Sequence, residues 1–358
     1  MAVTHRTRPI TRPHPGVAVG LGATLLALFV LDVALGSVRI PPTEVLAILF
    51  GKTSSPAWTS IVTQIRLPKA VTASLAGAAL SVGGLQMQTL FRNPLAGPSV
   101  LGVTSGASLG VALVTLSTGS ALGTATASVL GLSGSWLLVL AATGGGAAVL
   151  LLVLWVSYRI SDAVVILIVG LMIGNVTLSV VGIWQYFSQP EQIQDYVLWT
   201  LGSLHSVTPR HLPVLVTVVG AGTLLSLLVS KPLNALLLGE NYARSLGLNI
   251  RQTRGFIILI TSVLAGSVTG LCGPIGFVGV AVPHLARALL NTTNHFVLVP
   301  GVMVIGAIVM LGCDIISQVP GSQTVLPINA VTALVGSPVV IWVVLRRRNL
   351  GAGFSRKG

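Results

Sequence analysis

The sequence predicts an all-α, polytopic membrane protein with about ten transmembrane helices. Hydrophobic residues make up 53% of the 358 residues, and the mean hydropathy is +0.92. Asp, Glu, Lys and Arg together make up only 8%, whereas a soluble domain carries about a quarter of such residues. This composition excludes a soluble enzyme, a disordered chain and a secreted disulfide scaffold.

Apolar segments between charges, prolines and polar clusters give the ten predicted spans. Most hold about 17–23 residues, enough to cross a hydrocarbon core of ~30 Å at ~1.5 Å rise per residue. The first segment lacks a small-residue cleavage site before a polar mature domain, so we interpret it as a spanning helix and not as a signal peptide. The predicted spans are residues 17–37, 67–90, 99–117, 136–157, 163–186, 212–230, 255–271, 275–290, 297–316 and 325–345.

The basic residues predict that both termini are cytoplasmic. The net charge of +13 comes from residues at span ends and not from one basic stripe with interleaved aromatics. Positive-inside topology therefore explains the charge better than nucleic-acid binding does. With residues 1–16 and 349–358 as cytoplasmic tails, the inside segments hold 15 basic residues and the outside segments five. Four of those five lie between residues 39 and 69, which suggests an external acidic partner or a local exception to the rule.

No catalytic or metal-binding constellation can be assembled. Residues 51–53 read Gly-Lys-Thr, but Leu46 stands where a nucleotide-binding loop needs glycine, so the chain is not expected to be an ATPase. Asp32 and Asp314 lie near span ends, where snorkelling or a local hydrogen bond explains them better than ion coupling does. We therefore expect no catalytic residue, no bound metal and no resident cofactor. A membrane enzyme is disfavoured, and an ion-coupled secondary transporter is the less favoured alternative.

The longest cytoplasmic connection, residues 231–254, is predicted to be a docking element. Gly239 is expected to separate two short helices, and Gly247 to end the second. Glu240 and Arg244 have the i,i+4 spacing of a helical ion pair. An ordinary connector is the alternative, although such a connector needs fewer residues.

Nine short motifs follow one another along the chain, at residues 66–69, 76–84, 88, 92–96, 102–107, 238–247, 276–279, 283–287 and 334–338. In this order they resemble the motifs of the ABC-importer permeases for iron chelates and cobalamin. The resemblance implies a type II importer architecture, with a ten-helix permease domain at residues 17–348. It also implies a second permease subunit, two cytoplasmic ATPases that hydrolyse the ATP, and an extracytoplasmic substrate-binding protein.

The resemblance also implies roles for individual residues. Arg66 and Lys69 would dock the binding protein, and their spacing places both on one helix face, from which we expect them to point out of the membrane. The residues that would contact the ATPase are Leu238, Gly239, Glu240, Ala243, Arg244, Leu246 and Gly247. The residues that would line or gate the translocation pathway are Asn93, Pro94, Leu95, Ser161, Asp162, Asn175 and Ser179.

Three departures from the family pattern bear on assembly. Lys69 and Gln318 stand where the family usually has arginine, and Asn329 replaces a common glycine. A lysine makes a point-charge contact and lacks the bidentate grip of arginine. These changes favour a heterodimer with a paralogous permease, with a homodimer as the alternative. The predicted substrate is a ferric siderophore imported across the cytoplasmic membrane; haem and cobalamin are the alternatives.

Overall fold

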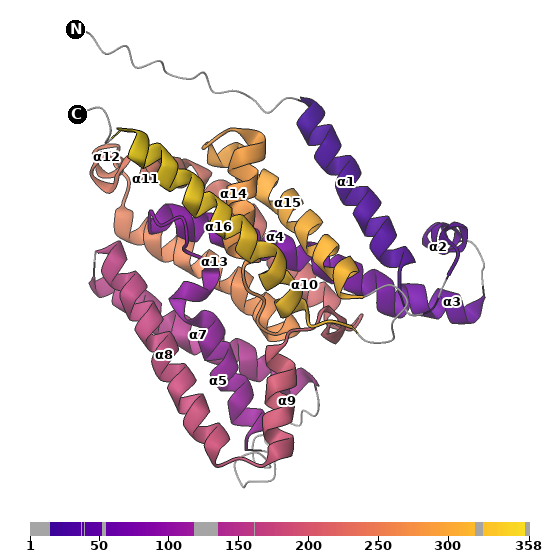
Figure 1. Ribbon diagram of the computed structural model, residues 1–358. Helices are drawn as coiled ribbons and strands as arrows, with labels where there is room; N and C mark the ends of the chain where they lie inside the picture. Colours follow the sequence, from indigo (N-terminus) through magenta and orange to yellow (C-terminus); the bar gives the residue numbers. More distant parts are fainter. Residues whose placement is uncertain are drawn as a thin grey trace.

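The computed structural model describes residues 15–36, 38, 40–51, 55–117, 135–160, 162–318 and 325–354. Every regular element within these residues is a helix or a helical turn, which confirms the all-α prediction (Figure 1). The predicted N-terminal tail lies almost wholly outside the described residues. The predicted C-terminal tail is helical up to Phe354, because the last helix continues beyond the predicted span.

The elements follow one another in a simple order. They are α1 Pro15–Ala34, α2 Pro42–Leu49, α3 Pro56–Ile61, the π-helical turn η1 Val62–Arg66, α4 Leu67–Leu90, the 3₁₀ turn η2 Pro98–Leu101, α5 Val103–Thr115, α7 Ser135–Arg159, α8 Ala163–Tyr186, α9 Pro190–Thr200, the 3₁₀ turn η3 Leu204–Ser206, α10 Leu212–Leu228, α11 Ser230–Leu238, α12 Glu240–Ser245, α13 Ile250–Cys272, α14 Val278–Leu290, α15 His295–Ser317 and α16 Ile328–Phe354.

Each predicted span coincides with a helix of the structure. Among the described residues, six helical segments are long and apolar enough to cross a membrane, and α10 with α11 forms a further candidate bent by 50°. Three shorter apolar helices account for the remaining predicted spans. They are Val103–Thr115, Val278–Leu290 and Ile328–Trp342.

Two of the boundaries that differ from the predicted ones have a local cause. The third span begins only at Val103, because the chain before it turns through η2 and Gly102 with a φ of 75°. The helix α13 begins at Ile250, five residues before the predicted span, and the Asn249 side chain caps it. Arg251 is therefore helical, although the sequence predicted it to lie in the connection of residues 231–254.

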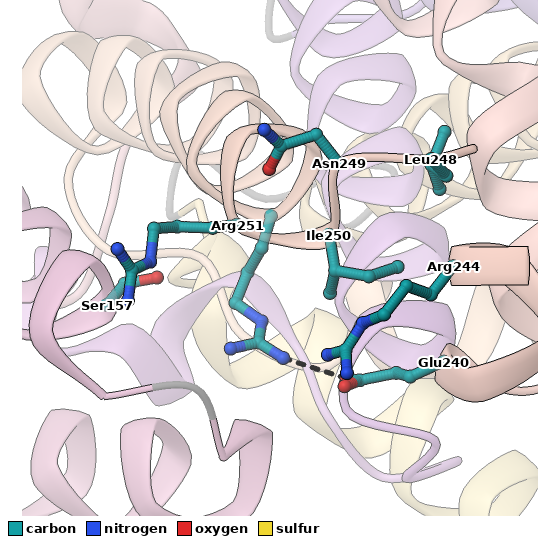
Figure 2. A pocket seen from close by; sticks show the side chains of 8 residues that line it. Ser157, Glu240, Arg244, Leu248, Asn249, Ile250 and Arg251 are labelled. Carbon is teal, nitrogen blue, oxygen red and sulfur yellow. Dashed lines mark hydrogen bonds and ion pairs between the residues drawn. The ribbon is translucent and has the colours of Figure 1, made fainter.

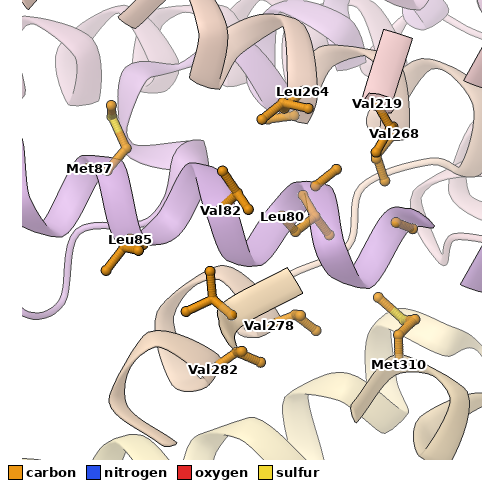
Figure 3. Packing of buried hydrophobic residues seen from close by; sticks show 14 of the residues in the cluster. Leu80, Val82, Leu85, Met87, Val219, Leu264, Val268, Val278, Val282 and Met310 are labelled. Atoms are coloured by element: carbon orange, nitrogen blue, oxygen red, sulfur yellow. The ribbon is translucent and has the colours of Figure 1, made fainter. Parts of the chain in front are cut away.

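The helix α4 forms the centre of the larger group of helices. It packs against α10, α13, α14 and α15, and it is buried along nearly its whole length. Figure 3 shows its apolar side chains meeting Val278 and Val282 of α14 and Leu264 of α13. The burial of one apolar helix by several others is the expected arrangement for the core of a membrane bundle.

Paired glycines let the neighbouring backbones approach α4. A Cβ atom at Gly77 would overlap the carbonyl oxygen of Gly306 in α15, and one at Gly84 would overlap that of Gly279 in α14. Membrane helices pack through such small residues, because lipid offers no hydrophobic drive for larger side chains to associate.

The helices α5, α7, α8 and α9 gather beside this group (Figure 1). They share a second, smaller core that includes Ala107, Val111 and Tyr196. In Figure 1 the start of α1 and the end of α16 lie at the same end of the molecule as α11 and α12. That end is the one predicted to be cytoplasmic, and the other is called the predicted outer end below.

Candidate functional site

At the predicted outer end, Lys69 of α4 is buried between two carboxylates. Its Nζ atom lies 2.7 Å from Oδ2 of Asp314 in α15 and 3.6 Å from Oδ1 of Asp32 in α1. The exposed fractions are 3% for Lys69, 0% for Asp32 and 2% for Asp314. Gln318 donates from Nε2 to Asp32 Oδ1 at 2.9 Å and to Asp314 Oδ2 at 3.4 Å. These four residues, the outer charge cluster, join α1, α4 and α15.

Arg66 also forms its hydrogen bonds within this chain. Its guanidinium group donates to the carbonyl oxygens of Val33 at 3.1 Å, Ala34 at 2.6 Å and Val38. It thereby satisfies carbonyl groups at the C-terminal end of α1, where a cation is favourable. Only 5% of Arg66 is exposed.

The expectation that Arg66 and Lys69 point out of the membrane is wrong for this structure. The physical reason is that acceptors of α1 and α15 lie within reach of both cations, and a buried charge must be paired. Their role in docking a binding protein stays a prediction.

His205, in η3, lies close enough to the outer charge cluster to respond to it. The surrounding protein desolvates the imidazole and lowers the pKa of His205, Lys69 lowers that pKa further, and Asp314 raises it. The net direction is downward, so the imidazole is neutral near pH 7 and adds no cation to the cluster.

The two short helices predicted in the connection after α10 are present as α11 and α12. Gly239 separates them with a φ of 122°, and Gly247 follows α12 with a φ of 85°, both conformations that favour glycine. Leu238 is 67% exposed and Leu246 is 62% exposed. Ala243 was predicted to contact the ATPase, but it is fully buried, so its side chain supports the packing of α12 and presents no surface to a partner.

The ion pair formed by Glu240 differs from the predicted one. Its Oε1 atom lies 2.8 Å from a terminal guanidinium nitrogen of Arg254, and Arg254 is buried in α13. The predicted partner Arg244 is exposed on α12. A tertiary contact therefore replaces the local i,i+4 pair, because a buried guanidinium gains more from a carboxylate than an exposed one does. The pair fastens α12 to α13.

Residues 92–95, called the gate segment below, include the predicted gate residues Asn93, Pro94 and Leu95. The segment lies directly against α11, which together with α12 is called the coupling helices below. Arg92 donates to the carbonyl oxygen of Leu236 at the end of α11, at 3.1 Å. Asn93 accepts from the backbone N–H of Leu95 at 2.9 Å, which closes a tight turn. Pro94 offers its carbonyl oxygen to Nε2 of His284 in α14 at 2.8 Å. The segment is thus held between α11 and α14.

A cavity of about 680 Å³ joins part of the predicted gate to the coupling helices. Its lining includes Arg92 and Asp162 together with Leu238, Gly239 and Glu240. Asp162 also caps α8 by accepting from Val164 N at 2.7 Å. The structure thereby brings one predicted gate residue, Asp162, together with three of the predicted ATPase contacts. Ser161 lies outside the described residues.

Asn175 and Ser179 lie elsewhere. Both are exposed on α8, where Ser179 donates to the carbonyl oxygen of Asn175 at 2.9 Å. Asn175 is 13 residues beyond Asp162, or about 20 Å along the helix. These two residues therefore form a separate polar strip on the free face of α8 and do not join the gate.

Polar contacts from α4 into its neighbours were not predicted. Gln86 accepts from Thr261 of α13 at 2.7 Å and donates to Ser226 of α10 at 2.8 Å. Gln88 accepts from Arg287 of α14 at 2.7 Å. The signal available in the sequence was the pair of glutamines, two positions apart, within an apolar span.

Two departures from the family pattern have a structural role. Gln318 donates hydrogen bonds to both carboxylates of the outer charge cluster, where an arginine would add a second cation. Asn329, at the start of α16, accepts from the backbone N–H of Gly276 at 3.0 Å, just before α14. Both Gln318 and Asn329 are neutral, and each forms its hydrogen bonds within this chain.

Within the described residues, helices at the predicted spans, two short helices at one end and a gate segment held against them are the features of a membrane transport subunit. Residues 24–346 match the model of the FecCD transport family, and the chain belongs to that family. It is therefore the permease of an ABC importer in the cytoplasmic membrane; ATP hydrolysis resides in a separate subunit, and a substrate-binding protein belongs to such systems.

Individual relatives cover nearly the whole chain. The vitamin B12 import system permease protein BtuC of Klebsiella pneumoniae is 34% identical over 333 residues, which are 93% of this chain and 94% of the relative. The hemin transport system permease protein HmuU of Yersinia pestis is 32% identical over 335 residues, 93% and 97% of the two chains. A solved structure described as an inward-facing conformation of a putative metal-chelate type ABC transporter gives a TM-score of 0.80 at 28% identity, covering 93% and 100%.

Proposed function

We propose that the chain carries a large metal chelate across the cytoplasmic membrane. The observation that carries this proposal is the contact between the gate segment and the coupling helices, in a family whose relatives import vitamin B12 and hemin. The ferric siderophore predicted from the sequence belongs to the same chemical class. Haem and cobalamin are supported to the same degree, so the class of large chelate is the substrate proposed here.

We further propose that two permease subunits enclose the pathway, with both termini cytoplasmic. The exposed strip of Asn175 and Ser179 on α8 would then face the passage. A paralogue is the preferred second subunit, because Arg66 and Lys69 are occupied within this chain and a paralogue would supply the stronger grip on the binding protein. Mass analysis of the complex from its native host tests this, and two copies of this chain alone would refute the paralogue.

Uptake assays on a deletion strain test the substrate class. We expect loss of accumulation of a labelled ferric siderophore, hemin or cobalamin, and restoration by the plasmid-borne gene. Vanadate should abolish the restored uptake, because a partner ATPase drives it. Unchanged uptake of all three chelates would overturn the proposal, and uptake that responds to a protonophore but not to vanadate would favour the ion-coupled alternative.

The Glu240–Arg254 pair is proposed to transmit movement from the ATPase to α13. Replacing Glu240 by Gln removes the carboxylate charge and leaves Arg254 buried, where a hydrogen bond to a charged group contributes about 1.5–3 kcal/mol. We expect roughly tenfold less substrate transported per ATP hydrolysed, with ATP hydrolysis retained. The measurement is transport and hydrolysis together in proteoliposomes that hold the complete importer.

Glu191→Gln is the matched control, since Glu191 is exposed on α9 away from α11 and α12. It makes the same chemical change without touching the pair. Equal transport per ATP in the Glu240→Gln and wild-type complexes would contradict the coupling role, and so would an equal loss in both variants.

A further inference from the structure

A basic cavity of about 270 Å³ lies where the end of α7 meets the start of α13 (Figure 2). Its lining contains the guanidinium groups of Arg244, Arg251 and Arg254 and one carboxylate, that of Glu240. Figure 2 shows Arg251 on the side of Ser157 and Arg244 on the side of Glu240. The cavity therefore gathers three positive charges and one negative charge at the predicted cytoplasmic end.

The single carboxylate is already committed. Glu240 forms its ion pair with Arg254, which leaves Arg244 and Arg251 as the excess positive charge. Within the part of the chain that the structure describes, neither Arg244 nor Arg251 takes part in an ion pair. Two like charges that share one cavity favour an anion between them.

The surface of α7 beside the cavity has the character of a membrane interface. Leu151, Trp155 and Tyr158 are all exposed, and their spacing places them along one face of α7. Arg251 lies over the Tyr158 ring at 5.0 Å from its centroid, and Arg159 lies over the Trp155 ring at 5.7 Å. Tryptophan and tyrosine are enriched where lipid headgroups meet the hydrocarbon core.

We propose that this cavity binds the phosphate group of an anionic phospholipid, with Arg244 and Arg251 as the donors. The acyl chains would lie along the exposed face of Leu151 and Trp155. A free phosphate ion shares the charge but has no tail to cover that apolar face, so the structure favours the lipid. Basic pockets between helices on the cytoplasmic side bind anionic headgroups in this manner.

The test uses the full-length chain purified in neutral detergent. It is titrated with phosphatidylglycerol, with phosphatidylcholine of the same acyl chains, and with inorganic phosphate. Retained lipid is counted by native mass spectrometry, and the Tm is recorded in parallel. We expect retention of phosphatidylglycerol and a raised Tm, with neither effect from phosphatidylcholine or phosphate at equal concentration.

Variants assign the binding to the cavity. Arg251→Gln should weaken phosphatidylglycerol binding roughly fivefold, the contribution of one basic residue near an anionic surface. Arg251→Lys should retain most of the affinity, because it keeps the charge. Arg210→Gln is the matched control, an exposed arginine in the connection before α10. Since Arg251 is exposed, its substitution leaves the packed core untouched, which gel filtration verifies.

Four results would overturn the proposal. Equal binding of the two lipids would remove the anion requirement, and equal loss in Arg251→Gln and Arg210→Gln would remove the site. A Tm shift produced by inorganic phosphate alone would assign the cavity to a free ion. Loss of a co-purified ATPase from Arg251→Gln, with unchanged lipid binding, would assign it to the partner protein.

Discussion

Replacing Lys69 by Met is expected to destabilise the protein by about 3–5 kcal/mol, the cost of removing one partner from a buried ion pair. The ammonium group is the cation that lies between Asp32 and Asp314, at 3.6 Å and 2.7 Å. Its loss leaves two carboxylates facing one another in a site from which water is excluded. The helices α1 and α15 should then separate from α4 at the predicted outer end.

Unfolding of the purified chain in mixed micelles measures this effect. The variant that combines Lys69→Met with Asp32→Asn and Asp314→Asn should recover most of the lost stability, because it removes the unpaired charges. Lys231→Met is the matched control at an exposed position and should change stability little. A Lys69→Met protein as stable as the Lys231→Met protein would show that the outer charge cluster does not hold the helices together.

The outer charge cluster shows what the sequence could not predict. Asp32, Lys69 and Asp314 each stood out as a charge near a span end, but they come from three helices far apart in the chain. No periodicity within one span relates residues of different spans, so their meeting depends on helix packing. The sequence therefore predicted that Lys69 is an exposed cation, whereas the structure has it buried.

The positions of the spans could be predicted closely, because hydropathy marks the residues that lipid must cover. The spans at residues 67–90 and 163–186 coincide with α4 and α8. The start of α13 could not be predicted in this way. Its first turns carry Arg251 and Arg254, and hydropathy reports contact with lipid and not helical structure. The helix extends beyond the predicted span at its polar start.

The two short helices of the coupling region were predictable, but the ion pair of Glu240 was not. Gly239 and Gly247 are local signals, since each ends a helix by its own backbone conformation, and both were placed correctly. The partner of Glu240 is not a local property. Glu240 pairs with Arg254, which lies 14 positions further along the chain. Spacing alone favours Arg244 at i,i+4.

Replacing Gly84 by Ala is expected to destabilise the protein by about 3 kcal/mol, at the upper end of the usual cost of overpacking a core. The added Cβ would overlap the carbonyl oxygen of Gly279 in α14. The backbone of α14 cannot yield, because Gly279 is itself confined: a Cβ there would lie 2.7 Å from Pro98 Cδ and 2.8 Å from Leu80 O. The two helices must therefore move apart and lose the packing shown in Figure 3.

Gly220→Ala provides the matched comparison, because nothing lies within 4 Å of a Cβ at that position in α10. There the same substitution should stabilise the protein by about 0.5–1 kcal/mol, since alanine favours the helix over glycine. The two variants are thus expected to shift the unfolding free energy in opposite directions, measured in the same micelles. A Gly84→Ala protein that gains stability as Gly220→Ala does would show that α4 and α14 do not make this close approach.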